Sequence, residues 1–269
     1  MSPAAAGATD PDRWLHLAEI DSTNGEAMRR GLAGEAGPLW VLADRQTSGR
    51  GRSGRSWASS PGNLYASLLM TTSAPIAKVG QLSLVAGVAT IDAIRKAGPL
   101  ASGETLRLKW PNDILIGAAK AGGILVESST RGRKEAMVAV IGIGLNLGSA
   151  PTDLGRAATY LTAHGLTLSP REALCFLARE MDAWLKTWDE GAGFAGVRQA
   201  WLERAGPVGE PLSVLANEGP IEGRFVGLDV EGALMIAESG GRVRHFNYGD
   251  VSLANAPPTG AAQEKDDSP

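Results

Sequence analysis

The alternation of apolar and polar positions changes character near Gly206. Upstream of that glycine, short apolar runs of strand length are mixed with segments that have helical periodicity, which is typical of an α+β arrangement. The pattern predicts strands over residues 40–43, 63–70, 106–110, 123–126 and 137–147, and helices over residues 23–32, 79–96 and 170–190.

The clearest helix is the one predicted over residues 170–190. Ser169 can cap it, Pro170 suits its first turn, and Glu172 stands three residues after the serine, where a capping box requires it. Apolar side chains then recur on one face at Leu174, Leu177, Met181, Trp184 and Trp188. We interpret this tryptophan-rich stripe as core packing and not as a ligand cage.

Downstream of Gly206 the chain reads as strands and tight turns. Short strands at this spacing predict a small open barrel. We therefore predict a first domain over residues 13–205 and a small β domain over residues 206–256, between disordered tails at residues 1–12 and 257–269. The strands of the second domain are expected at residues 211–216, 221–228, 233–238, 242–246 and 250–254.

Composition narrows the classes of function. With 43% apolar and 20% charged residues the chain can build a core, and its net charge of −3 disfavours a surface that binds nucleic acid throughout. One cysteine, Cys175, and three scattered histidines disfavour a disulfide framework and a Cys- or His-based metal site. No uninterrupted apolar run approaches the ~18 residues that span a membrane, and the first residues lack a signal-peptide pattern. A cytoplasmic protein without membrane contact is expected.

The most unusual segment is residues 46–57, where three arginines alternate with three glycines and no carboxylate is near. The glycines match the G-x-G-x-x-G spelling, but a dinucleotide site needs a helix after them, and Ser-Ser-Pro-Gly at residues 59–62 followed by a strand pattern excludes one. A Walker A motif is also absent from the sequence. Glycine lets the backbone approach a ligand closely, and the guanidinium group of arginine binds two oxygens at once, so the segment suits binding of a carboxylate or phosphate. A solvated loop or a weak RNA-binding patch is the alternative.

Polar groups also stand at the ends of predicted strands. Pro111 marks the end of one strand and leaves Asn112 and Asp113 beside a turn. Their oxygens suit Mg²⁺, although an Asx-type turn is the simpler explanation for this segment taken alone. Lys120 enters a glycine pair and a buried strand, whereas a lone lysine is usually a solvated surface charge.

Two further segments have both a structural and a functional interpretation. Gly142 and Gly144 leave room for a flat group against a strand, and Asn146 could bond to that group; a bulged core strand is the alternative. At the start of the first helix, Thr23 and Glu26 have capping-box spacing, and capping alone would explain the hydroxyl groups of residues 21–24.

In this order the segments resemble the bacterial biotin–protein ligases. The matching motifs are Asp-Ser-Thr-Asn at 21–24, Gln46, Gly-Arg-Gly-Arg-x-Gly-Arg-x-Trp at 49–57, Lys-Trp-Pro-Asn-Asp at 109–113, Lys-x-x-Gly-Ile-Leu-Val-Glu at 120–127 and Gly-x-Gly-Leu-Asn at 142–146. The resemblance implies a mixed sheet with flanking helices, as in class II aminoacyl-tRNA synthetases, plus a C-terminal SH3-like β-barrel. It implies synthesis of biotinyl-AMP from biotin and ATP with Mg²⁺, and transfer of biotin to a lysine of a biotin carboxyl carrier domain.

The resemblance also implies residue roles. Lys120 and Arg52 are the expected catalytic residues, beside the carboxylate and the reacting phosphate. The expected biotin-binding residues are Ser22, Thr23, Asn24, Gln46, Arg50, Gly51, Arg52 and Lys120. The expected ATP or adenylate contacts are Trp57, Asn112, Asp113 and Asn146, with Asp113 as the Mg²⁺ ligand. We expect residues 49–57 to close over bound ligand.

The sequence departs from the family pattern at two places, and other functions remain as alternatives. Only about twelve residues precede the ligase part, where many relatives carry a helix-turn-helix domain, so we expect no DNA binding. A monomer or weak homodimer is also expected. Ala58 follows Trp57 where some relatives have an aromatic residue, which would weaken nucleotide packing. The rivals are a lipoate–protein ligase, a non-catalytic biotin-binding regulator and an RNA-binding module.

Overall fold

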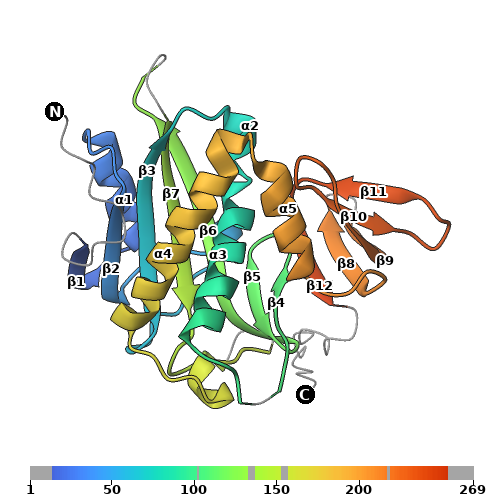
Figure 1. Cartoon of the computed structure of the whole chain (residues 1–269), viewed down its shortest axis with the longest axis horizontal. Coiled ribbons are helices and arrows are strands. Elements are labelled where there is room, and N and C mark those ends of the chain that lie inside the picture. The colour runs from blue at the N-terminus through green and yellow to red at the C-terminus, as the bar shows by residue number, and fades with distance from the viewer. Residues whose placement is uncertain (1–13, 102, 133–136, 153–156, 217–218, 254–269) are drawn as a thin grey trace, which may run out of the picture.

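The computed structural model of the chain describes residues 14–101, 103–132, 137–152, 157–216 and 219–253. Both predicted tails, residues 1–12 and 257–269, lie outside the described residues. Two sheets and a layer of helices make up the described part, and the smaller sheet stands beside the larger one (Figure 1).

The larger sheet has seven strands in the order β1-β2-β3-β7-β6-β5-β4. Strands β1 and β2 are parallel, and all other neighbours in this sheet are antiparallel. The mixed sheet expected from the sequence is thus confirmed. Its strands are β1 (Leu15–Ile20), β2 (Leu39–Gln46), β3 (Leu64–Thr72), β4 (Leu106–Lys109), β5 (Asp113–Ile116), β6 (Ala119–Thr130) and β7 (Met137–Leu145).

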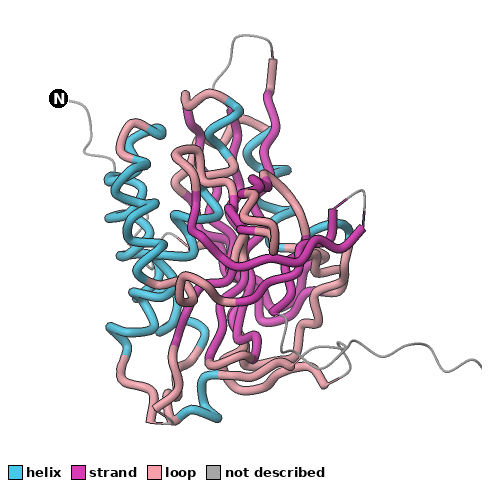
Figure 2. The backbone as a smooth tube through the Cα atoms, turned by 90° about the vertical axis from the view of Figure 1, so that its right-hand side faces the viewer, coloured by secondary structure: helices cyan, strands magenta, loops and turns pink. Residues whose placement is uncertain are grey.

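The two faces of this sheet bury different amounts of apolar surface. Helices α3 (Leu82–Ala97), α4 (Pro170–Trp188) and α5 (Phe194–Glu203) cover one face and form the helical layer beside the strands (Figure 2). Strand residues such as Trp40, Leu68 and Ile141 join the large core there. Helix α1 (Thr23–Leu32) covers the other face. Alternate strand residues point to this face and pack with the helix in a small apolar cluster of described residues: Ala27, Val41, Leu69, Val138 and Val140.

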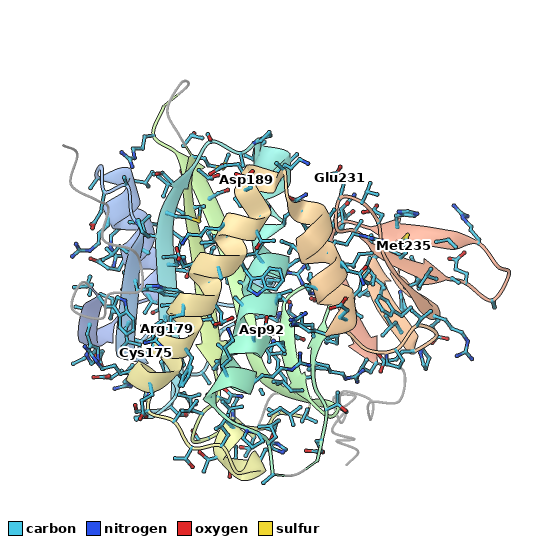
Figure 3. The ribbon with its side chains drawn as sticks, in the orientation of Figure 1. Asp92, Cys175, Arg179, Asp189, Glu231 and Met235 are labelled. Atoms are coloured by element: carbon cyan, nitrogen blue, oxygen red, sulfur yellow. The ribbon has the colours of Figure 1, made fainter. Side chains whose placement is uncertain are left out.

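The α4 predictions are confirmed. Ser169 Oγ accepts from the Glu172 backbone N–H (3.3 Å) and Glu172 Oε2 accepts from the Ser169 N–H (2.8 Å), which completes the capping box. Trp188, Leu174, Leu177 and Met181 are buried, whereas Trp184 is partly buried and donates from Nε1 to Asp92 of α3 (3.0 Å). Asp92 faces the helical layer (labelled in Figure 3). The stripe is therefore core packing.

The helix predicted over residues 79–96 begins at Leu82 in the structure, later than predicted. A short helix, α2 (Ile76–Val79), precedes α3, and the combined segment Ile76–Ala97 is long and apolar enough by composition to cross a membrane. The sequence expectation concerned uninterrupted apolar runs, and it did not anticipate this segment, whose mean hydropathy is high although polar residues interrupt it. Two thirds of its most apolar window (67%) is buried inside the protein, where α3 packs against α4 and α5. Burial in the core accounts for the hydropathy.

The smaller sheet is antiparallel with the order β11-β10-β9-β8-β12. Among the described residues its edge strands are not paired with each other, so a closed barrel is not found, while the five predicted strands are present. Hydrogen bonds join this sheet to the rest of the chain, for example from Trp110 Nε1 to the Gly232 carbonyl (3.1 Å). The strands are β8 (Pro211–Ala216), β9 (Gly219–Leu228), β10 (Leu234–Ala237), β11 (Val243–Phe246) and β12 (Asp250–Leu253).

Candidate functional site

A cavity of about 770 Å³ lies on the face of the larger sheet that carries the start of α1. Strands β3, β5, β6 and β7, residues 50–57 and the start of β12 form its walls. The structure brings eleven of the twelve predicted site residues to this cavity: Ser22, Thr23, Asn24, Gln46, Arg50, Gly51, Arg52, Trp57, Asn112, Asp113 and Lys120.

The remaining one, Asn146, is not at the cavity wall. It is buried just beyond the end of β7, and its Nδ2 donates to the Thr159 carbonyl (3.0 Å). The backbone of Lys120 is hydrogen-bonded to residues 157 and 159 in the same place. Asn146 therefore supports the segment behind Lys120, and its contact with a nucleotide stays a prediction.

The start of α1 provides a buried polar end to the cavity. Ser22, not Thr23, is the N-cap, because its Oγ accepts from the Gly25 N–H (3.3 Å), whereas Thr23 uses its N–H and hydroxyl to bind Gln46 Oε1 (2.9 and 3.1 Å). Glu26 pairs with Arg29 and Arg30 instead of closing a capping box. The predicted box is thus wrong, since these groups have other partners.

Ser67 of β3 ties this polar end to the sheet. Its Oγ lies 2.8 Å from Thr23 Oγ1 and 2.6 Å from Asn24 Oδ1. Asn24 Nδ2 in turn donates to the carboxylate of Glu127 on β6 (2.8 Å). Because Ser67, Thr23 and Asn24 are all buried, their orientation is fixed before any ligand binds.

Glycines form a flat floor below the network. A Cβ on Gly142 would collide with Asn24 Oδ1, and one on Gly144 would lie 2.6 Å from Trp57 Cε2. The room expected for a flat group is therefore real, and in this structure the indole of Trp57 occupies part of it. The buried Trp57 Nε1 has no hydrogen-bond partner among the described residues, and the Lys120 ammonium lies 5.5 Å from the ring centroid.

Residues 49–57 fold back on themselves over the cavity. Hydrogen bonds from Gly51 N–H to the Arg55 carbonyl (2.7 Å) and from Trp57 N–H to the Gly49 carbonyl (2.9 Å) close the segment. Between them lies a single turn, η2 (Arg52–Gly54), whose Ser53 and Gly54 have left-handed φ values of 55° and 73°. Glycine permits the left-handed φ at residue 54 at no steric cost, whereas Ser53 adopts the same region as a non-glycine residue.

The arginines of this segment differ in their partners. Arg50 pairs with Glu127 (3.1 Å) and Arg55 pairs with Asp250 (2.7 Å). Arg52 donates only to neutral oxygens, Asn112 Oδ1 (3.4 Å) and a backbone carbonyl of residue 249 (3.3 Å), and within the described ranges it forms no ion pair. Desolvation lowers the Arg52 pKa, yet the guanidinium remains charged near neutrality. It is thus a cation available to an anionic ligand.

Asp113 gathers two lysines beside Arg52. Its Oδ1 is in a short ion pair with Lys120, and its Oδ2 lies 2.9 Å from Lys109 Nζ. Burial alone would raise the pKa of Asp113, but the charges of Lys120 and Lys109 outweigh it and lower that pKa to about 2. One permanent carboxylate therefore holds two ammonium groups side by side.

The same contacts bear on the predicted Mg²⁺ ligand. Both Asp113 oxygens are engaged by ammonium groups, and the described part of the chain contains no group of three His, Cys, Asp or Glu side chains that could hold a metal. These residues do not fit a protein-held Mg²⁺. Since Mg²⁺ commonly binds through phosphate oxygens, the ion would have to arrive as part of a nucleotide substrate.

The charge of the cavity is opposite to that of the chain. Five cationic and two carboxylate side chains line it: Arg50, Arg52, Arg55, Lys109, Lys120, Asp113 and Asp250. The chain as a whole carries −3. A surplus of buried or half-buried cations with an apolar, flat floor suits an elongated ligand that is neutral at one end and anionic at the other.

Sequence reasoning missed four participants. Lys109 and Arg55 stand inside the quoted motifs, so the motif itself could have identified them. Ser67 and Asp250 lie in ordinary strand patterns, and nothing in the sequence separates them from other strand residues. The single cysteine, Cys175, lies on α4 in the helical layer, away from the cavity (Figure 3).

Comparisons with known proteins agree with this geometry. Two family models match: the Biotin/lipoate A/B protein ligase family over residues 18–146 and the Biotin protein ligase C terminal domain over residues 208–254. A biotin–[acetyl-CoA-carboxylase] ligase of Paracoccus denitrificans is 41% identical over 234 residues, which cover 84% of this chain and 95% of the relative.

Solved structures give the same result. The biotin protein ligase from Aquifex aeolicus in complex with biotin and ATP has a TM-score of 0.74 and 28% identity, covering 91% of this chain and 99% of that one. The biotin protein ligase from Leishmania major in complex with biotinyl-5-AMP has a TM-score of 0.60 and 26% identity, covering 89% of this chain and all of that one (100%). On sequence and fold together, the chain belongs to the biotin protein ligase family.

Proposed function

We propose that this protein is an ATP-dependent biotin–protein ligase of the cytoplasm, which forms biotinyl-AMP and transfers biotin to a lysine of a biotin carboxyl carrier domain. One observation carries the proposal. Cations from three separate elements, Arg52, Lys109 and Lys120, converge on one side of a cavity whose other side is neutral and polar. That pattern fits an acid whose carboxylate must meet a phosphate.

The neutral end would bind the ureido ring of biotin. Ser22, Thr23, Asn24 and Gln46 present hydroxyl and amide groups at the start of α1, and several of them are buried and already hydrogen-bonded. Groups fixed in advance lose little entropy when a ligand binds. The glycine floor leaves the apolar part of the ligand in contact with backbone. Trp57 would shift to make room or stack against the ligand.

In the first step, a carboxylate oxygen of biotin attacks the α-phosphorus of ATP. A P–O bond forms, the bond from that phosphorus to the bridging oxygen breaks, and pyrophosphate leaves. Two anions approach each other, so the main requirement is positive charge placed where it is needed. Arg52, which has only neutral partners, and Lys120 supply that charge. Asp113 keeps Lys120 and Lys109 in place against their mutual repulsion.

In the second step, the neutral amine of the carrier lysine attacks the acyl carbon of biotinyl-AMP. An amide bond forms, the mixed anhydride breaks, AMP leaves and the amine releases its proton. The protein needs mainly to hold the anhydride and to admit the lysine. Residues 49–57, which fold over the cavity, are placed to exclude water until the carrier arrives.

Mass spectrometry of a biotin carrier domain tests the function directly. Incubation with the protein, biotin and Mg-ATP should add one biotinyl group to one lysine, and omission of ATP should abolish the addition. Lipoic acid offered to the matching lipoyl domain is the control for the rival ligase. Modification with lipoic acid alone would contradict the proposal, and so would biotin binding without release of pyrophosphate, which a non-catalytic regulator predicts.

A further inference from the structure

The start of β12 contacts three cationic side chains of the cavity in succession. Arg55 Nη2 pairs with Asp250 Oδ1 at 2.7 Å. On either side of Asp250, backbone carbonyls accept hydrogen bonds, at residue 249 from Arg52 (3.3 Å) and at residue 251 from Lys109 (2.7 Å). Three consecutive residues, Gly249 and the first two of β12, thus receive three cations that line the cavity from the larger sheet and the segment 49–57.

Asp250 is the charged member of this contact. The Arg55 guanidinium that it binds also donates from Nε to the carbonyl of Arg52 (3.2 Å). Arg55 therefore links Asp250 to the backbone of the turn Arg52–Gly54. A side chain at Gly54 would meet nothing within 4 Å, so packing around this glycine does not hold the turn. Its position depends largely on the arginine contacts.

The smaller sheet holds Asp250 firmly. Strand β12 pairs with β8, with Asp250 opposite Leu215. The preceding Gly249 has φ +147°, and a Cβ there would lie 2.9 Å from Val214 Cγ1. Only glycine fits such a position without strain. The carboxylate is therefore presented by a strand paired with β8, while the arginine comes from the segment 49–57.

We propose that Asp250 is a positioning residue for retention of the adenylate: through Arg55 it holds the turn Arg52–Gly54 over the cavity, so that the smaller sheet controls how long the adenylate stays bound. The proposal rests on the proposed function of the cavity. Arg52, Arg55 and Asp250 all line the cavity, so lifting of the turn to release a bound adenylate would break the Arg55–Asp250 pair. The pair is half exposed, so a moderate effect is expected, on the order of fivefold.

The experiment uses the full chain with Asp250→Ala and Asp250→Asn, and Glu238→Ala as the matched control. Glu238 pairs with Arg244 (3.6 Å) on the same sheet and does not line the cavity. Two readouts are needed: the dissociation rate of preformed biotinyl-AMP, and tryptic cleavage of residues 50–55 in the ligand-free protein. We expect Asp250→Ala to raise both about fivefold, Asp250→Asn to raise them less, and Glu238→Ala to change neither.

A double-mutant cycle separates positioning from other effects. If Asp250 acts through Arg55, Asp250→Ala adds nothing to the change caused by Arg55→Ala, and the exchange Arg55→Asp with Asp250→Arg restores slow dissociation. Normal retention and normal cleavage in both Asp250 variants would overturn the inference. Absence of adenylate formation in the unaltered protein would instead refute the proposed function, while the cleavage readout would still decide the role of Asp250.

Discussion

Replacement of Lys120 by alanine is the strongest test of the proposed chemistry. The substitution removes a buried ammonium group, 7% exposed, that is paired with Asp113 at the end of the cavity where Arg52 also lies. Loss of one preorganised charge donor typically lowers a rate by roughly 10²–10³, or about 3–4 kcal/mol in the barrier. We therefore expect biotin-dependent pyrophosphate release to fall at least on the order of a hundredfold.

The same substitution has a cost in stability that must be measured separately. Removing one partner of a buried ion pair typically costs ~3–5 kcal/mol. Here Lys109 stays 2.9 Å from the other oxygen of Asp113, so the carboxylate keeps a counter-charge and the loss should fall at the lower end of that range. A domain of ordinary stability, ~5–15 kcal/mol, would remain folded.

The assay compares single-turnover formation of biotinyl-AMP with urea unfolding for the unaltered protein, Lys120→Ala and Lys120→Arg. Arginine keeps the charge but not the compact ammonium geometry, so we expect it to recover stability more fully than rate. A folded Lys120→Ala protein that forms the adenylate at near-normal rate would refute the role assigned to Lys120. A proportional loss of rate and of folded fraction would indicate a purely structural residue.

Three further predictions follow from contacts in the site and the core. Gly144→Ala places a Cβ 2.6 Å from Trp57 Cε2, so biotin affinity measured by calorimetry should fall at least about tenfold (~1.4 kcal/mol), and unchanged affinity would show that the floor is not used. The pKa of Asp113 is lowered from 3.8 to about 2, which corresponds to a contribution of about 2 kcal/mol to the free energy of unfolding. This contribution is present above pH ~4 and is lost as the pH falls toward ~2. Acid unfolding of Asp113→Asn should therefore lack that component. Trp188→Ala should cost about 3–5 kcal/mol in urea unfolding, because the side chain is buried and its Nε1 donates to Gln81 (3.0 Å); a cost below ~1 kcal/mol would contradict its place in the core.

Strong periodicity and strong capping signals were sufficient to predict several elements. Helix α1 spans the predicted residues 23–32, and the capping box at Ser169 is present. Local signals failed where tertiary contacts compete for the same groups. Thr23 has a hydroxyl group that could cap the helix, but its N–H and hydroxyl form hydrogen bonds with Gln46 and Ser67, two residues that only the folded sheet brings near. The SH3-like barrel implied by the resemblance is not confirmed among the described residues, because barrel formation depends on pairing between distant edges that no local pattern specifies.

The candidate site was predictable to the extent that its motifs name their own residues. Eleven of the twelve predicted residues share a cavity, although they come from several strands and a loop. Asp250 was not predictable, because its contact with Arg55 joins residues 195 positions apart. Asn146 was interpreted as a ligand contact, and the structure places its amide on the Thr159 carbonyl (3.0 Å). A motif identifies which residues matter, but it does not separate a residue that touches a ligand from one that supports its neighbour.

The unequal burial on the two sides of the seven-stranded sheet has a consequence for how this protein can change. Most of the free energy that keeps the chain folded comes from the helix-covered side, where the extended core lies. The opposite side, which holds the cavity, contributes a cluster of only five buried apolar residues. Substitutions at cavity positions outside the buried Asp113–Lys120 pair can therefore accumulate without unfolding the protein, and the scaffold should accommodate selection for altered acid substrates.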